Sequence, residues 1–177
     1  MAATNKSSRP PSVRRIALDI ICEVEAGGYC DVILGNTLAH ANLAPRDAAL
    51  LTRMAYGVFA WRDRLDWTLA PLARKGFDKL DPEVRGTLRL GLLQLLFLDR
   101  IPEHAAVSTS VDLARGAAGK GAGGLVNAIL RRIQREGERR LPKGPTHARL
   151  AIEYSHPAWL VKLWGSELGW DTTRELL

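Results

Sequence analysis

The chain has 177 residues, of which 46% are apolar and 25% charged, and its net charge is +6 at pH 7. This length allows one domain of ordinary size with a sizeable core. A membrane-spanning helix and a secretory signal are excluded, because no run of about 18 apolar residues occurs and the first residues are polar and basic. Cys22 and Cys30 form neither a disulfide framework nor a metal-binding pattern. We therefore expect a cytoplasmic protein with no membrane partner.

The positive charge is concentrated in two segments. Residues 1–15 hold four basic residues and no acid, and residues 120–149 hold eight basic residues against two acids. Basic segments of this kind are expected in a protein that binds a polyanion, although arginine-rich helix faces can also be merely solvated. We expect the two segments to meet in space and form one polyanion-binding surface.

The first predicted helix follows a basic arm, residues 1–11, which we expect to be disordered. Ser12 is a suitable helix cap. Arg14 and Arg15 fall in the first turn, where positive charge opposes the helix dipole at a cost of about 0.3–1 kcal/mol. We therefore expect these arginines to serve a purpose other than helix stability. The apolar stripe of this helix has helical spacing and consists of Val13, Ile16, Ala17, Ile20 and Val24.

The next segments also have helical spacing, over residues 31–42, from Pro45 to Trp61 and over residues 65–72, with a loop predicted at 74–78. No segment alternates polar and apolar residues as a half-buried strand does. The predicted fold class is all-α.

A central core helix is predicted at Leu88–Leu98, where eight of eleven residues are large and apolar. They point all round the helix, so other elements must surround it. Asp81 and Pro82 favour a helix start just before it, and Pro102 ends it. A second helix follows, with apolar residues at helical spacing.

The glycine-rich segment 116–124 separates this helix from the next. Gly119, Gly121 and Gly124 match G-x-G-x-x-G, but the match follows a helix, whereas the dinucleotide fingerprint follows a strand. The segment is not a P-loop either. We predict a flexible loop between helices, in which Lys120 could contact a phosphate.

A row of arginines is predicted on the following helix, from about Leu125 to Arg140. Arg132, Arg135 and Arg139 have the spacing i, i+3, i+7, and Arg131 lies beside them. Guanidinium groups at this spacing can follow a phosphate backbone, because each donates up to two hydrogen bonds. Such contacts carry no base information.

Residues 141–145 have the composition of a linker, and the tryptophan-rich remainder contains a helix after His156 and Pro157. Because the chain stops at Leu177 within a predicted helix, we expect a chain cut short within a longer protein.

No active site is predicted. The four histidines lack metal-ligand spacing, and Ser108 and Ser110 lack the context of a catalytic nucleophile. Neither cysteine has basic neighbours that would activate it. We expect no catalytic residue, metal site or cofactor in this chain.

Three segments, Arg46–Leu72, Leu88–Arg115 and Gly124–Ile133, resemble the NusB family. The resemblance covers roughly residues 12–140, and its RIPEHAAV and GLVNAILR motifs are quite specific. It implies an all-helical fold of two small bundles that binds RNA, here a NusB-like domain at 12–141 followed by a linker and linker helix at 142–177. Arg14 and Arg15 match the arginine-rich start of the family's first helix. They are the first RNA contacts we expect, before Lys120, Arg131, Arg132, Arg135 and Arg139.

Two subfamilies compete. The segment Tyr154–Trp164 resembles the connection to a methyltransferase domain in RsmB (Sun) proteins, which methylate carbon 5 of a cytosine in 16S ribosomal RNA. That resemblance implies ribosomal RNA and the protein's own methyltransferase domain as partners and S-adenosylmethionine as cofactor of the full-length enzyme. The alternative is a stand-alone NusB antitermination factor that binds RNA and a ribosomal protein. A third possibility is a module whose basic face contacts the catalytic domain.

The methyltransferase part is missing from this sequence. No glycine-rich turn follows a strand, and no Pro-Cys pair is present, so neither Cys22 nor Cys30 inherits a catalytic role. We expect this chain to contribute RNA binding and positioning rather than chemistry. The oligomeric state is not predicted.

Overall fold

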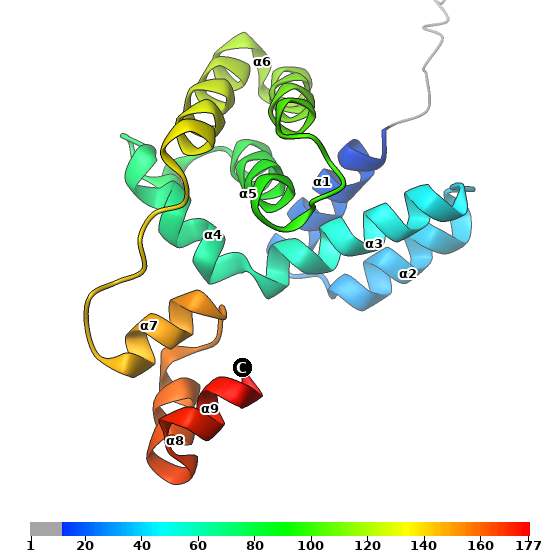
Figure 1. Cartoon of the computed structure of the whole chain (residues 1–177). Helices are drawn as coiled ribbons and strands as arrows, with labels where there is room; N and C mark the ends of the chain where they lie inside the picture. Colours follow the sequence, from blue (N-terminus) through cyan, green and yellow to red (C-terminus); the bar gives the residue numbers. More distant parts are fainter. Residues whose placement is uncertain (1–11) are drawn as a thin grey trace, which may run out of the picture.

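The computed structural model describes residues 12–177, and the predicted disordered arm, residues 1–11, lies outside them. Across the described residues the regular structure is helical throughout, which confirms the all-α prediction (Figure 1). The elements, η marking a short 3₁₀ helix, are α1 (Val13–Glu25), α2 (Cys30–His40), α3 (Pro45–Ala60), α4 (Arg62–Leu69), η1 (Ala70–Leu72), η2 (Phe77–Lys79), α5 (Pro82–Phe97), α6 (Glu103–Glu136), α7 (Thr146–Glu153), α8 (Ala158–Leu168) and α9 (Trp170–Leu176).

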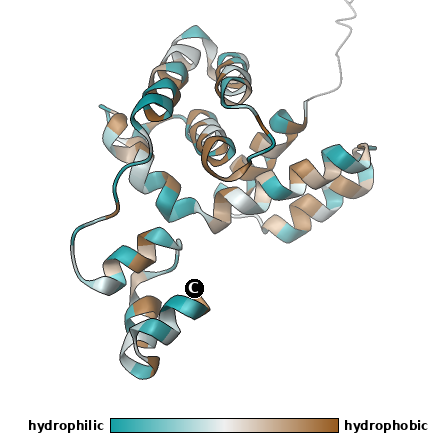
Figure 2. Cartoon of the chain, in the orientation of Figure 1, coloured by the Kyte–Doolittle hydropathy of each residue, from teal (hydrophilic) through white to brown (hydrophobic). Residues whose placement is uncertain are grey.

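Helix α5 is the centre of the fold, as its sequence predicted. It packs against α1, α3, α4 and α6, and its apolar residues form the middle of the core (Figures 1 and 2). Asp81 caps it by accepting a hydrogen bond from the Glu83 N–H at 2.9 Å, and Pro82 occupies the first turn. Helices α1–α3 also contact one another, whereas α6 packs chiefly on α5.

Gly91 lets α6 approach α5 closely. A Cβ atom at this position would lie 2.6 Å from the Leu130 Cδ1 atom and 2.8 Å from the Ser110 Oγ atom. These two neighbours belong to different halves of α6, so one missing side chain makes room for both.

The prediction of a flexible loop at 116–124 is wrong. Only Ala118 and Gly119 depart from helical backbone angles, and they bend α6 into a first half (103–117) and a second half (120–136) (Figure 1). Gly119 has φ +84°, a conformation that glycine adopts without cost. Gly123 then packs against the first half, since a Cβ there would lie 3.3 Å from the Val111 carbonyl oxygen. The glycines therefore serve a tight bend rather than a flexible loop.

The C-terminal helices have a small apolar cluster of their own, formed by Leu150, Ala151 and Val161, and α7 lies against α4. No helix within residues 12–177 is both long and apolar enough to cross a membrane. The division at residue 141 stays a prediction.

Candidate nucleic-acid interface

Arg14 is held at the start of α1 by a buried amide. Its Nε donates a hydrogen bond of 2.7 Å to the Gln94 Oε1 atom of α5. Gln94 is 1% exposed, and its Nε2 donates to the Leu90 carbonyl oxygen at 2.9 Å. Burial lowers the pKa of Arg14 below its ordinary value. The Gln94 amide is neutral, so it orients the Arg14 guanidinium without balancing its charge.

Arg15 is paired with two carboxylates. Its Nη2 lies 2.7 Å from the Asp19 Oδ1 atom and 2.6 Å from the Glu83 Oε1 atom. Burial alone would lower the pKa of Arg15, but the hydrogen bonds to Asp19 and Glu83 outweigh that effect and raise it. The two arginines, adjacent in sequence, thus differ in the charge they present to a ligand.

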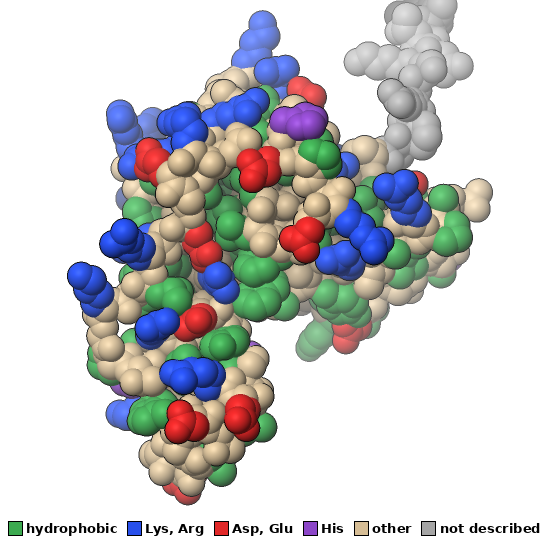
Figure 3. Space-filling model, in the orientation of Figure 1, with side chains coloured by type: hydrophobic (Ala, Val, Ile, Leu, Met, Phe, Trp, Pro, Cys, Tyr) green, Lys and Arg blue, Asp and Glu red, His purple; other side chains and the backbone are tan. Residues whose placement is uncertain are grey.

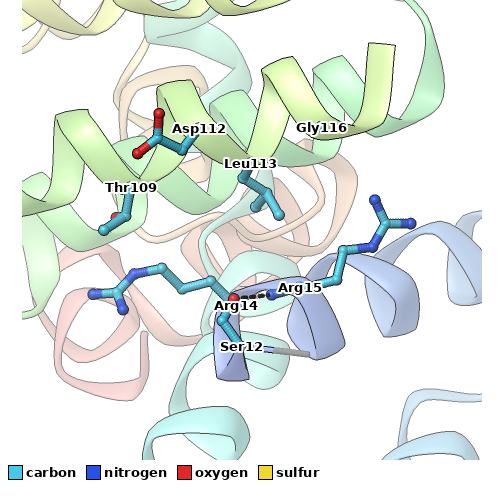
Figure 4. Close-up of a pocket in the computed structure, with 7 residues that line it drawn as sticks. All are labelled: Ser12, Arg14, Arg15, Thr109, Asp112, Leu113 and Gly116. Atoms are coloured by element: carbon cyan, nitrogen blue, oxygen red, sulfur yellow. Dashed lines mark hydrogen bonds between the residues drawn. The ribbon is translucent and has the colours of Figure 1, made fainter. Parts of the chain in front are cut away.

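Both arginines line a hollow of about 420 Å³ between the start of α1 and the first half of α6. Figure 4 shows their side chains leaving α1 in opposite directions, Arg14 toward the end of the hollow at Thr109 and Arg15 toward the end at Gly116. The hollow has a mixed lining of cations, hydroxyls and one carboxylate, which suits a polar anionic ligand better than an apolar one. Its residues are Ser12, Arg14, Arg15, Thr109, Asp112, Leu113 and Gly116.

The second basic set lies on the second half of α6. Lys120 is exposed next to the bend, and Arg131, Arg132 and Arg135 are exposed farther along. Arg132 pairs with Glu136 at 2.8 Å, and Arg131 donates to the Gln134 side chain at 3.0 Å. Figure 3 shows Lys and Arg side chains gathered over this part of the molecule.

Arg139 does not belong to the predicted row. Helix α6 ends at Glu136 because Gly137 has φ +81°, so Arg139 lies in the irregular segment that follows. Its guanidinium carbon lies 3.7 Å from the centre of the Trp67 ring, and its Nη1 donates to the Trp67 carbonyl oxygen at 3.1 Å. The helical spacing on which the row was predicted is absent there, and Arg139 fastens the segment after α6 to α4.

The two basic segments were expected to form one polyanion-binding surface, but they line separate hollows. Arg132 and Arg139 line a separate hollow of about 280 Å³ with residues of α4 and η1, such as Thr68 and Leu72. That hollow shares no residue with the one at Arg14. In Figure 1 the first half of α6 lies between the start of α1 and the second half of α6, and Lys120 directly follows the bend that joins the two halves.

Sequence reasoning missed two groups of residues. Arg74 and Lys75, in the segment whose composition predicts a loop, line a hollow of about 510 Å³ together with Arg132 and the apolar side chain of Leu125. The other is Gln94, which lies within the apolar run of α5. Its signal was visible, because a polar side chain in a helix that is apolar all round must be buried and must find a partner.

Comparison with known proteins assigns this chain to a family. Residues 11–135 match the NusB family. The chain belongs to the NusB family. The match includes α1–α5 and all of α6 but its last residue, and every predicted RNA contact except Arg139 lies inside it.

The curated relatives are longer proteins. The chain is 36% identical over 168 residues to the "Probable ribosomal RNA small subunit methyltransferase B" of Bacillus subtilis, with 93% of this chain and 37% of that protein covered. It is 35% identical over 161 residues to the "Ribosomal RNA small subunit methyltransferase B" of Thermus thermophilus, again covering 37% of the relative. This NusB-family chain thus spans little more than a third of the relatives it matches.

Two solved structures share the fold. "Crystal Structure of PH0851" aligns with a TM-score of 0.73 and 20% identity over 97% of this chain and 38% of that one. "Crystal Structure of Antitermination Factors NusB and NusE in complex with dsRNA" aligns with a TM-score of 0.63 and 21% identity over 70% of this chain and 94% of that one. At these identities the likeness concerns the NusB fold alone.

Proposed function

We propose that this chain is the RNA-binding, substrate-positioning N-terminal part of an S-adenosylmethionine-dependent 16S ribosomal RNA cytosine-C5 methyltransferase. The observation that carries the proposal is the extent of the likeness. The methyltransferase B relative from Bacillus subtilis matches 93% of the chain, whereas the NusB of the NusB–NusE complex matches 70% of it. The longer likeness reaches beyond the family match at 11–135, which favours this reading over that of a stand-alone factor.

The role of the chain is to bind RNA for chemistry performed elsewhere in the full-length protein. Phosphate contacts from Arg14 and from the second half of α6 would set the register of the RNA. Binding energy remote from the reacting base can hold that base in place for reaction.

S-adenosylmethionine does not fit the described residues, which form only helices and carry their glycine-rich segment in a helix bend. It belongs, under this proposal, to the methyltransferase domain of the longer protein. Within residues 12–177 no three or more His, Cys, Asp or Glu residues are grouped so that they could hold a metal ion.

The alternative is a stand-alone antitermination factor with RNA and a ribosomal protein as partners. The observation in its favour is the fold shared with the NusB of the complex with NusE and dsRNA. A full-length gene product with a methyltransferase domain would argue against it.

The proposal is tested by titrating the chain with labelled fragments that tile the small-subunit ribosomal RNA, at several salt concentrations. We expect binding that weakens with salt, since the released counterions set the slope, about 0.7 per phosphate contact on single strands. Absence of binding to every fragment would contradict the proposal. If the chain then bound the separate catalytic domain instead, the basic face would be an interdomain contact.

A further inference from the structure

Gln94 is a buried polar side chain in α5, the central core helix. A buried amide without partners is costly, so its position calls for a reason. Both of its hydrogen bonds are accounted for: its Nε2 binds the Leu90 carbonyl oxygen of the same helix, and its Oε1 accepts from the Arg14 Nε. The first bond fixes the amide, and the second uses the fixed amide to fix Arg14.

The choice of atoms matters for what Arg14 can still bind. Gln94 takes the inner nitrogen, Nε, and leaves both outer Nη groups of the guanidinium for the hollow that Arg14 lines. These are the groups that bind a phosphate through two parallel hydrogen bonds. Because Gln94 is neutral, it orients the cation without cancelling its charge.

Arg15 provides the contrast. It is held by Asp19 and Glu83, whose two carboxylates balance its charge, whereas no ion pair to Arg14 is present among residues 12–177. One helix turn therefore contains a neutralised arginine and an oriented, uncompensated one.

We infer that Gln94 is a positioning residue for RNA binding: it holds the Arg14 guanidinium ready to bind a phosphate in the hollow between α1 and the first half of α6. This inference rests on the proposed function. Orienting a long side chain before binding removes an entropy cost of about 0.5–1.5 kcal/mol, which corresponds to roughly two- to tenfold in affinity.

The test is RNA affinity of the 177-residue chain carrying Gln94→Met, which removes the amide and retains most of the volume. We expect affinity for the RNA fragment that the unchanged chain binds to fall by roughly two- to tenfold. The matched control is Thr87→Val on the same helix, because the buried Thr87 hydroxyl has no hydrogen-bond partner. Thermal unfolding of each variant is measured to test whether the fold is retained.

A double-mutant cycle separates positioning from a purely structural role. If Gln94 acts through Arg14, Arg14→Ala and the Arg14→Ala/Gln94→Met double variant bind RNA equally well. A structural role would make the two losses add.

Gln94→Glu gives a second, independent readout, and it decides the matter if the methionine variant does not fold. A carboxylate at this position would still accept from the Arg14 Nε but would cancel the charge. We expect weaker binding and a flatter dependence on salt, by about 0.7 in slope for the lost phosphate contact. An unchanged slope would count against the inference.

The possible failures are distinct. Absence of RNA binding by the unchanged chain would overturn the proposed function itself. If the unchanged chain binds and Arg14→Ala weakens that binding, but Gln94→Met binds as well as the unchanged chain, the positioning role of Gln94 is wrong while the proposed function stands.

Discussion

Arg64 of α4 binds Glu138 through two parallel hydrogen bonds, from its Nε to Oε1 at 2.6 Å and from its Nη2 to Oε2 at 2.9 Å. The same guanidinium donates to the Glu153 carbonyl oxygen at 3.2 Å, and the Arg64 backbone N–H donates to the Ser155 Oγ at 3.1 Å. Arg64 thus connects the body of the molecule, helices α1–α6, to both the segment after α6 and the end of α7.

Arg64→Ala is therefore expected to loosen α7–α9 from the body. Charged hydrogen bonds of this kind contribute roughly 1.5–3 kcal/mol each at most, and partial exposure reduces this. Limited proteolysis should cut within 137–145 faster, with the N-terminal fragment remaining folded. The control is Arg149→Ala, which removes the exposed Arg149 side chain and its pair to the half-buried Glu153 within α7. Equal cleavage rates in the two variants would contradict the role of Arg64.

The two arginines of α1 are expected to differ in RNA binding. Arg14→Ala removes an uncompensated charge and should weaken binding and flatten the salt dependence by about 0.7 in slope. Arg15→Ala should have the smaller effect, because Asp19 and Glu83 already balance that charge. Salt-dependent titrations of both variants, with Arg174→Ala on α9 as control, make the comparison. A larger loss for Arg15→Ala would reverse the assignment.

A buried ion pair makes stability depend on pH. Arg89, which is 2% exposed, binds both Glu25 and Asp66. Burial raises the pKa of Glu25, but Arg89 and Arg85 outweigh burial and lower it below 4.5. A carboxylate with a lowered pKa stabilises the folded state above its unfolded pKa, and this stabilisation is lost as the pH falls through the folded pKa.

Urea unfolding between about pH 6 and 3 should show this loss, and Glu25→Gln should be less stable at pH 6 but less sensitive to acid. Glu167→Gln on the exposed face of α8 is the matched control. If the acid sensitivity of Glu25→Gln equalled that of the unchanged chain, Glu25 would not be the group responsible.

The close approach of α5 and α6 predicts opposite effects at two glycines. Gly91→Ala would place a methyl group 2.6 Å from Leu130 and should destabilise the fold by about 1–3 kcal/mol. Gly121→Ala meets nothing within 4 Å in a helical segment and should be neutral or stabilise by up to about 1 kcal/mol. Chemical denaturation measures both. A destabilising Gly121→Ala would favour the flexible loop predicted from sequence over the bent helix.

The sequence by itself determined the fold class and the central place of α5. Capping residues, proline positions and apolar spacing act within a few residues, so they can be read along the chain. The family could be recognised for the same reason, from contiguous motifs. Arg14 and Arg15 could be chosen as candidate RNA contacts from their place at the start of the first helix.

Only the tertiary structure decided which charges remain available. Glu83 neutralises Arg15 from 68 residues away, Gln94 orients Arg14 from 80 residues away, and Trp67 holds Arg139 from 72 residues away. The glycine-rich bend likewise depends on one half of α6 packing against the other. Hydrogen bonds, ion pairs and close packing depend on distances in space, and the packing of α1, α4 and α6 around α5 sets those distances.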